Sequence, residues 1–267
     1  MSLILNSTLK HLRIPFSFNL LPIFLFALAI NPQTINWIKS SILFVCWHIL
    51  IYPASNGFNS YFDKDKKSIA GIKYPPSVTI ELYYFSIALD FLAILLALFV
   101  NIPTAISMLT YGLISKAYSH PSVRLKKKPF VSWIFVSFFQ GYFVFLVTYW
   151  GVQEITISRL TSSIIQIPAL LTTMMLLSVY PITQVYQHNE DSERGDLTLS
   201  LKLGVIGTFH FTAIAFVITA FCYLSYFFYY YDPQTMLIYF IFMSPLLIYY
   251  IIWYQKVKKN VDFADFE

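Results

Sequence analysis

The sequence predicts an all-α protein, a polytopic bundle of about eight transmembrane helices, and three observations carry this prediction. Of the 267 residues, 57% are hydrophobic and only 12% are charged, whereas soluble domains average about 25% charged residues. Apolar runs long enough to cross a hydrocarbon core recur along the whole chain. Lys and Arg collect between alternate runs, as they do in membrane proteins of defined orientation. These runs leave no room for a sizeable soluble domain, so residues 1–267 are expected to form a single transmembrane domain.

The first apolar run has features of a signal peptide, because Lys10 and Arg13 precede it and Ala27-Leu28-Ala29 lies near its end. Further apolar runs follow at once, and the first is close to the length of a spanning helix. We therefore interpret it as a retained signal anchor. In chain order the predicted spans are residues 15–31, 35–54, 79–100, 103–119, 130–152, 160–186, 205–230 and 235–254.

The basic residues predict the orientation of these spans. Most of the 18 Lys and Arg residues precede the first span or follow the second, fourth, sixth and last. The turns on the other side, near Asn31, Asn101 and Asp232, are short and nearly free of positive charge. Because positive loops stay in the cytoplasm, both termini are expected to be cytoplasmic. We expect a multi-pass protein of a bacterial inner membrane.

Several other classes of function fit the sequence poorly. The net charge of +5 does not indicate nucleic acid, because the basic residues lie between apolar runs rather than on one soluble face. Cys46 and Cys222 lie far apart inside apolar runs without a CxxC partner, so we interpret them as small buried residues. A secondary transporter would favour inverted repeats and polar sites at the membrane midplane. The polar clusters of this chain lie at one interface instead.

Two polar segments stand out on the predicted cytoplasmic side. In the first, Asn56, Asn59 or Ser60, and Asp63 share one face if the second helix continues through them. In the second, after the sixth span, Thr183, Gln187 and Asp191 share a face by the same arithmetic. The alternative interpretation is that both are ordinary solvated loops that set topology. The spacing of four residues between amide and carboxylate recurs after two different helices, which favours a functional role.

Carboxylates and amides beside a bilayer are costly, and magnesium gives a reason for them. Mg²⁺ prefers oxygen ligands and is often held by one or two carboxylates together with substrate phosphates. Lysines and arginines on the same side could neutralise the phosphate oxygens. Each of these basic residues could equally be an ordinary juxtamembrane charge.

The two segments resemble the motifs of the UbiA superfamily of membrane prenyltransferases. That family carries an NDxxDxxxD-type motif after its second helix and a DxxxD-type motif after its sixth. Asn59 and Asp63 match the first motif, and Gln187 and Asp191 match the second. The resemblance extends to the surrounding chain, through Arg13 with Pro15, Tyr118 to Lys128, and Gly195, Thr198 and Leu203-Gly204.

This resemblance implies a Mg²⁺-dependent enzyme, surrounded by membrane lipid, that transfers an isoprenyl group from a prenyl diphosphate donor to an aromatic or other lipophilic acceptor within the membrane. Asn59, Asp63 and Asp191 would be the catalytic residues. The metal ligands would come from Asp63, Asp65, Gln187, Glu190 and Asp191. The diphosphate would be bound by the basic residues Lys67, Lys73, Arg124, Lys126, Lys128, Arg194 and Lys202.

Three further residues are candidates for the acceptor or for stabilising a cationic intermediate. His188 and Tyr186 lie next to the second motif, although a His at a helix end is often only a hydrogen-bonding interface residue. Asp90 falls inside the third span, where it is either functional or bonded to a Ser, Thr or Tyr of a neighbouring helix. Lys116, near the cytoplasmic end of the fourth span, could reach the diphosphate or extend to the interface.

The chain departs from the family pattern at two motif positions. Lys67 stands where the first motif has its second aspartate, and Gln187 replaces the first aspartate of the second motif. The family's usual ninth helix also has no counterpart. These departures leave an alternative open, namely a non-catalytic membrane protein that binds or carries isoprenoid diphosphates.

Overall fold

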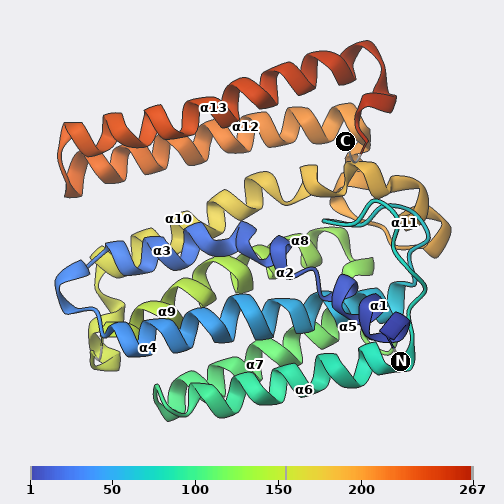
Figure 1. Ribbon diagram of the computed structural model, residues 1–267. Helices are drawn as coiled ribbons and strands as arrows, with labels where there is room; N and C mark the ends of the chain where they lie inside the picture. Colours follow the sequence, from blue (N-terminus) through green and yellow to red (C-terminus); the bar gives the residue numbers. More distant parts are fainter. Residues whose placement is uncertain (1, 154, 266–267) are drawn as a thin grey trace. The chain divides into compact units, whose positions relative to one another are not determined.

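The computed structural model describes residues 2–153 and 155–265, and these residues form helices and the segments that connect them, the longest of which joins Asp63 to Ile80 (Figure 1). The described residues contain no strand, and one isolated bridge joins Ile69 to Ile72. The predicted all-α class is therefore confirmed. In this part of the chain, seven helical segments are long and apolar enough to cross a membrane: Asn6–Ala29, Trp37–Asp63, Ile80–Ala97, Pro129–Gln153, Ser163–Arg194, Leu199–Tyr230 and Pro233–Lys259.

The eighth predicted span, residues 103–119, is a helix of lower hydropathy. It forms α7 (Ile102–Ser119), which has the same length of 18 residues as its neighbour α6 (Ile80–Ala97). Thr, Ser and Lys116 replace apolar residues along α7, so it is not among the seven apolar segments. α6 and α7 pack against each other. Among the described residues the structure therefore has seven candidate spans where the sequence predicted eight, and α7 is the predicted span that falls short.

The second span carries a π-helical insertion before the first polar segment. α4 (Trp37–Phe44) passes through the π-helix η3 (Val45–Ile51) into α5 (Tyr52–Asp63). The helix thus continues nine residues beyond the predicted end at residue 54, through Asn59 to Asp63. Since all of Tyr52–Asp63 is α-helical, the predicted shared face of Asn56, Asn59 and Asp63 is confirmed.

The second polar segment has a different backbone from the one predicted. α10 (Ser163–Val179) is followed by the 3₁₀-helix η7 (Pro181–Gln187) and then by α11 (His188–Arg194). A 3₁₀-helix has three residues per turn, so residues four apart do not lie on one face. The predicted shared face of Thr183 and Gln187 is therefore wrong.

Two other predicted spans are interrupted by turns or by a change of helix type. The first span is divided into the short helix α2 (Ile14–Ser17), the 3₁₀-turn η1 (Phe18–Leu20) and α3 (Leu21–Ala29). A helix not predicted from the sequence, α1 (Ser2–Leu12), precedes it. The fifth predicted span is α8 (Pro129–Phe138) and α9 (Val144–Gln153), joined by the π-helix η5 (Phe139–Phe143).

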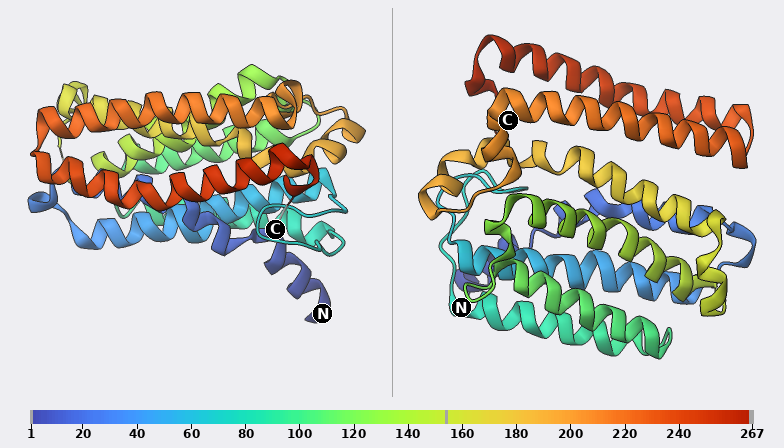
Figure 2. Two further views of the ribbon diagram at one scale, coloured as in Figure 1. Left: turned by 90° about the horizontal axis from the view of Figure 1, so that it is seen from above. Right: turned by 180° about the vertical axis from the view of Figure 1, so that it is seen from behind.

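The last two spans form a hairpin of long helices. α12 (Leu199–Tyr230) begins six residues before the predicted start, because the Thr198 side chain accepts a hydrogen bond from the Leu201 amide and caps the helix. α13 (Pro233–Lys259) begins with a similar cap, in which Asp232 accepts from the Thr235 amide at 2.7 Å. The two helices lie side by side in both views of Figure 2.

The contacts divide the chain into two compact units. The first comprises Met1–Lys127 and Phe143–Thr161, and the second comprises Lys128–Tyr142 and Ser162–Glu267. The first acidic segment belongs to the first unit and the second acidic segment to the second. The prediction that residues 1–267 form one domain stays a prediction.

The core of the first unit is built around large side chains from η3 and its neighbours. Trp47 is fully buried, and its indole N–H donates to the Thr148 hydroxyl of α9 at 3.1 Å. Its ring stacks on Tyr52 and meets Tyr111 of α7 edge-on. Cys46 is buried as predicted, whereas Cys222 in the second unit is only partly buried.

The second unit has a smaller core and a large apolar surface. Val185, Phe209, Val257 and Ala264 form its buried cluster. Among the described residues of α13, only Val257 is buried, although the helix is apolar along most of its length. Side chains of this kind on a spanning helix face lipid at little cost, because lipid tails are as apolar as leucine.

Gly141 in η5 provides a test of the packing in the second unit. A Cβ there would lie 2.7 Å from the backbone nitrogen of Thr173 and 2.8 Å from its Cα. Gly141→Ala is therefore expected to destabilise the protein by about 1–3 kcal/mol, as overpacking does. Thermal unfolding of the purified protein in detergent measures the change.

The matched control is Gly207→Ala in α12, where the nearest atom to the added Cβ is 3.4 Å away in Leu203 of the same helix. That substitution is expected to be neutral or slightly stabilising, because Ala is the better helix former. Equal unfolding temperatures for Gly141→Ala and the wild type would contradict the tight contact with Thr173.

Candidate functional site

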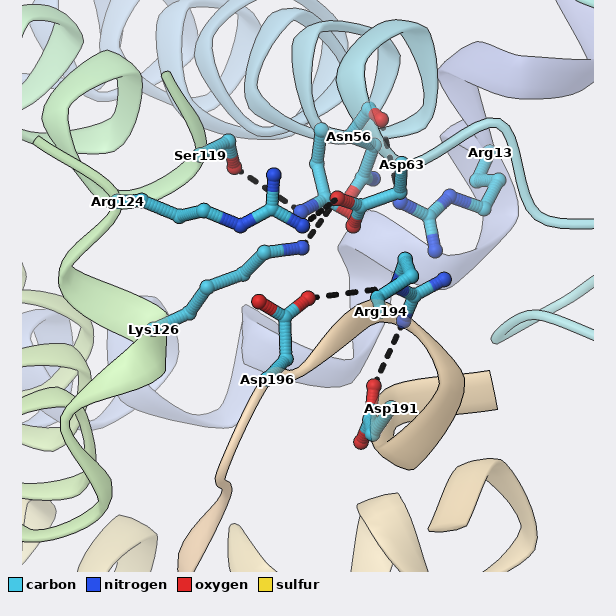
Figure 3. A network of polar contacts seen from close by, with 10 residues as sticks. Arg13, Asn56, Asp63, Ser119, Arg124, Lys126, Asp191, Arg194 and Asp196 are labelled. Carbon is cyan, nitrogen blue, oxygen red and sulfur yellow. Dashed lines mark hydrogen bonds and ion pairs between the residues drawn. The ribbon is translucent and has the colours of Figure 1, made fainter. Parts of the chain in front are cut away.

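Asp63 ends α5 and is the centre of a buried cluster of charges in the first unit (Figure 3). Its carboxylate is 5% exposed and forms an ion pair with the ammonium group of Lys126. The Arg124 guanidinium lies 4.0 Å from the same oxygen. Lys126 comes from the short turn η4 (Leu125–Lys127), and its side chain is only 6% exposed. The carboxylate predicted to bind metal thus lies beside two cations predicted to bind diphosphate.

The amides of α5 are fixed by neighbouring helices. The Asn59 side-chain N–H donates to the Ser119 hydroxyl at the end of α7, at 3.0 Å. The Asn56 side chain donates to the Leu12 carbonyl, and Arg13 donates back to the Asn56 carbonyl, both at 3.2 Å. Because each amide nitrogen is used as a donor, the side-chain oxygen is the group left to coordinate a cation.

Backbone strain accompanies these basic residues. Arg13, Lys64 and Arg124 have φ values of 49°, 51° and 43°, and they are the non-glycine residues with positive φ in the described part of the chain. The left-handed conformation costs an ordinary residue about 1–2 kcal/mol. Lys64 ends α5 in this way, as a helix C-cap, with its amide bonded to the Ser60 carbonyl. Strain of this kind persists where the surroundings determine a particular geometry.

The second acidic segment has its own charge cluster, in the second unit. Arg194 donates to Asp191 at 2.6 Å and to Asp196 at 3.2 Å (Figure 3). Both aspartates are buried, at 5% and 1% exposure. Gly195, with φ of 67°, ends α11 and turns the chain so that the Asp196 amide bonds back to the Asp191 carbonyl. The sequence reasoning missed Asp196, although it lies only five residues after Asp191.

The remaining predicted metal ligands lie around these two clusters. Glu190 is buried in the first turn of α11, and Gln187 occupies the N-cap position of that helix at the end of η7, without a capping hydrogen bond from its side chain. Asp65 follows α5 in the connection to α6. Within residues 2–153 and 155–265, no three His, Cys, Asp or Glu side chains come together as a ready-made metal site. One or two carboxylates in each cluster suit Mg²⁺, which keeps waters and takes further oxygens from phosphate.

The predicted diphosphate-binding residues divide into two groups. Arg124, Lys126 and Arg194 pair with the predicted metal-binding aspartates. The others are Lys67, Lys73, Lys128 and Lys202. Lys202 lies 4.7 Å from the centre of the Phe130 ring, and Lys73 lies 5.6 Å from that of Tyr74. Lys67 follows α5, and Lys128 is exposed immediately before α8.

His188 and Tyr186 flank the start of α11. The His188 Nε2 atom lies 2.8 Å from the Ser200 hydroxyl, which in turn lies 3.1 Å from the Thr208 hydroxyl. Thr208 donates to the Gly204 carbonyl at 2.7 Å, where α12 is interrupted by a non-helical residue. His188 thereby connects α11 to the break in α12. Tyr186 is half-buried in η7. Their predicted role toward an acceptor stays a prediction.

The comparison with known sequences decides the family. Residues 19–266 match the profile of the UbiA prenyltransferase family. This chain belongs to the UbiA prenyltransferase family. No curated protein sequence matches it significantly.

Solved structures agree with the UbiA fold. A UbiA homologue from Archaeoglobus fulgidus bound to GPP and Mg²⁺ superposes with a TM-score of 0.67 at 18% identity, over 95% of this chain and 88% of that one. The same homologue bound to DMAPP and Mg²⁺ gives 0.66. A digeranylgeranylglyceryl phosphate synthase gives 0.61 at 18% identity, over 99% and 91% of the two chains. The chain is an integral membrane protein of the UbiA fold.

Asp90 of this UbiA-family chain forms a buried ion pair between α6 and α7. Its Oδ2 pairs with the Lys116 ammonium group, and both side chains are less than 15% exposed. Lys116 also lies 5.1 Å from the centre of the Phe58 ring of α5. Asp90 thus has a structural partner, as the second interpretation expected, but the partner is a lysine rather than a Ser, Thr or Tyr. Lys116 reaches inward to Asp90 instead of extending to the interface.

Removing one partner of this pair leaves a charge in an apolar surrounding. Asp90→Leu is expected to destabilise the protein by about 3–5 kcal/mol, because Lys116 would remain buried and unpaired. Thermal unfolding in detergent measures the loss.

The double variant Asp90→Leu with Lys116→Met removes both charges and is expected to recover most of the stability of the wild type. A double variant no more stable than Asp90→Leu alone would contradict the account of the pair as the source of the loss.

Proposed function

We propose that this protein is an integral-membrane prenyltransferase that transfers an isoprenyl group from a prenyl diphosphate to an aromatic or other lipophilic acceptor with Mg²⁺. The observation that carries the proposal is the cluster around Asp63. A buried carboxylate at the position of the family's metal-binding aspartate lies beside Lys126 and Arg124. The family match over residues 19–266 and the GPP, DMAPP and Mg²⁺ bound to a UbiA homologue of the same fold support it.

The residues of the first cluster would have two roles in binding the donor, one toward the metal ion and one toward the diphosphate. Asp63, with the side-chain oxygen of Asn59, would hold the metal, and Asp65 would lie within the same segment. Lys126 and Arg124 would supply positive charge for the diphosphate oxygens, and Arg can bind them through two parallel hydrogen bonds. When bound, Mg²⁺ neutralises charge on the leaving diphosphate and so lowers the barrier to its departure.

The second cluster would take part through Asp191, with Gln187 and Glu190 as further oxygen donors. Gln187 can coordinate through its carbonyl but brings no charge. Arg194, Lys202, Lys67, Lys73 and Lys128 would add to the positive potential that attracts the donor. The proposed contacts for the acceptor or for a cationic intermediate are His188, Tyr186 and Asp90. The ion pair with Lys116 makes the Asp90 carboxylate less available for such a contact.

The proposed location is a bacterial inner membrane with the acidic segments facing the cytoplasm. It rests on the basic residues that follow alternate spans, because positive loops remain on the cytoplasmic side. Soluble prenyl diphosphate would then reach the site from the cytoplasm, and the acceptor would enter from the lipid.

A second candidate function is binding or carriage of isoprenoid diphosphates without catalysis. Lys67 and Gln187 favour it, because each removes a carboxylate that the family motifs supply. The two candidates separate in one assay. Purified protein is incubated with labelled prenyl diphosphate, Mg²⁺ and a membrane extract as acceptor source, and released diphosphate is measured. Turnover supports the enzyme, and retention of intact donor supports the binder.

Asp63→Ala is expected to abolish Mg²⁺-dependent release of diphosphate, because the first cluster loses its carboxylate. The initial rate of release with a saturating donor measures the effect. The matched control is Asp262→Ala, an exposed aspartate in the 3₁₀-turn η8 (Val261–Phe263), which is expected to keep the wild-type rate. Unchanged turnover of Asp63→Ala would count decisively against the assignment.

Gln187→Asp restores the carboxylate that the family motif has at this position. It is expected to lower the Mg²⁺ concentration for half-maximal rate by about tenfold, since a charged oxygen ligand replaces a neutral one. A titration of the rate with Mg²⁺ checks this. Thr183→Asp, which adds the same charge at an exposed position on another face of the 3₁₀-helix η7, is the control and is expected to leave the half-maximal concentration nearly unchanged. A higher Mg²⁺ requirement in Gln187→Asp would exclude position 187 from the metal site.

A further inference from the structure

The cluster around Asp63 pairs the predicted metal ligand with the predicted diphosphate ligand directly. A carboxylate that forms a tight ion pair with Lys126 cannot offer the same oxygen to a metal ion at full strength. The ammonium group of Lys126 has three N–H donors, and the one directed at Asp63 is not available to phosphate while the pair is intact. The pair therefore competes with both roles that the proposed function gives to its partners.

We propose that Lys126 is an exchangeable counter-ion of Asp63, which neutralises the carboxylate before metal binds and moves to the diphosphate once the carboxylate takes the metal. This inference rests on the proposed function and adds to it the order in which charges are exchanged. Lys126 then serves both states of the site. It limits the affinity for metal alone and raises the affinity for the donor.

The burial of Lys126 supports this role. Lysine is almost never fully buried unless it is paired, and the whole residue is only 5% exposed. Its neighbour Lys127, in the same turn, is exposed. Arg124 approaches the same Asp63 oxygen from a left-handed backbone conformation, so the turn directs two cations at one carboxylate. An ordinary juxtamembrane lysine would extend toward water instead.

The second acidic segment repeats the arrangement independently. Arg194 holds Asp191, the other aspartate matched to a metal-binding position, together with Asp196. In each unit the candidate metal ligand therefore has a cation of its own, which is the buried Lys126 in the first unit and the half-buried Arg194 in the second. A carboxylate left bare in an apolar bundle would be costly, and the internal cation removes that cost before the ligands arrive.

An exchange of this kind predicts opposite effects on two ligands. Lys126→Gln removes the competitor of the metal and also removes a cation for the diphosphate. Mn²⁺, as a spectroscopic substitute for Mg²⁺, is expected to bind about tenfold more tightly in the absence of donor, the order of effect of losing one hydrogen bond to a charged group. A non-cleavable geranyl thiolodiphosphate is expected to bind about tenfold more weakly at saturating Mn²⁺.

The experiment uses the full chain in lipid nanodiscs. Bound Mn²⁺ is followed by electron paramagnetic resonance, and the analogue by competition with labelled geranyl diphosphate. Lys127→Gln is the matched control, because it removes the same charge from the adjacent, exposed position. It is expected to change neither constant by more than about twofold, since exposed charges are screened.

Three results would overturn the proposal. The first is Mn²⁺ affinity in Lys126→Gln that is unchanged or weaker, and the second is an effect equal to that of Lys127→Gln. Tighter binding of both ligands also overturns it, because Lys126 would then only repel the metal. If Lys126→Gln does not fold, Arg124→Gln decides by the same two measurements, with smaller shifts of the same signs because its contact is 4.0 Å.

Failure of the proposed function has a different signature. A wild-type protein that binds Mn²⁺ but neither binds nor cleaves geranyl diphosphate would remove the prenyltransferase assignment. The Mn²⁺ affinities of Lys126→Gln and Lys127→Gln would then still show whether Lys126 competes with a cation for Asp63.

Discussion

Neutralisation of charge inside an apolar molecule is the constraint on which the rest of this structure depends. Only 12% of the residues are charged, and the carboxylates at the interesting positions are buried. Each is paired within its own unit: Asp63 with Lys126, Asp90 with Lys116, and Asp191 with Arg194. A bare ion in such surroundings would cost several kcal/mol, of order ~3 or more on insertion scales. These ion pairs therefore allow the bundle to contain buried carboxylates and still remain folded.

Local backbone geometry serves these pairs. α5 runs unbroken to Asp63, so its amides and carboxylate form one stripe, and the left-handed Lys64 ends it there. η4 turns Lys126 inward while Lys127 in the same turn faces solvent. Gly195 has a similar role after α11, because its turn brings Asp196 to Arg194, which also pairs with Asp191. In both clusters a short turn adds a charged partner to the one that the helix carries: Lys126 beside Asp63 in the first unit, and Asp196 beside Arg194 in the second.

The sequence predicted what depends on composition and regular repeat. The helical class, most spans and the stripe on α5 follow from hydropathy and from 3.6 residues per turn. The predictions were wrong or incomplete where the backbone does not have 3.6 residues per turn, as in the 3₁₀-helix at Thr183 and the π-helix before Tyr52. The ion pairs could not be predicted from the sequence, for a different reason. Asp90 and Lys116 are far apart in the chain, so only tertiary packing shows that they neutralise each other, and the same holds for Asp63 and Lys126.

The left-handed backbone at Arg124 has a consequence for any redesign of this turn. Glycine adopts this conformation without steric cost, so Arg124→Gly would relieve the backbone strain of the turn. It would also delete a guanidinium that lies 4.0 Å from the Asp63 carboxylate. Because glycine has no side chain, an unstrained backbone and a second cation beside Asp63 exclude each other at this position.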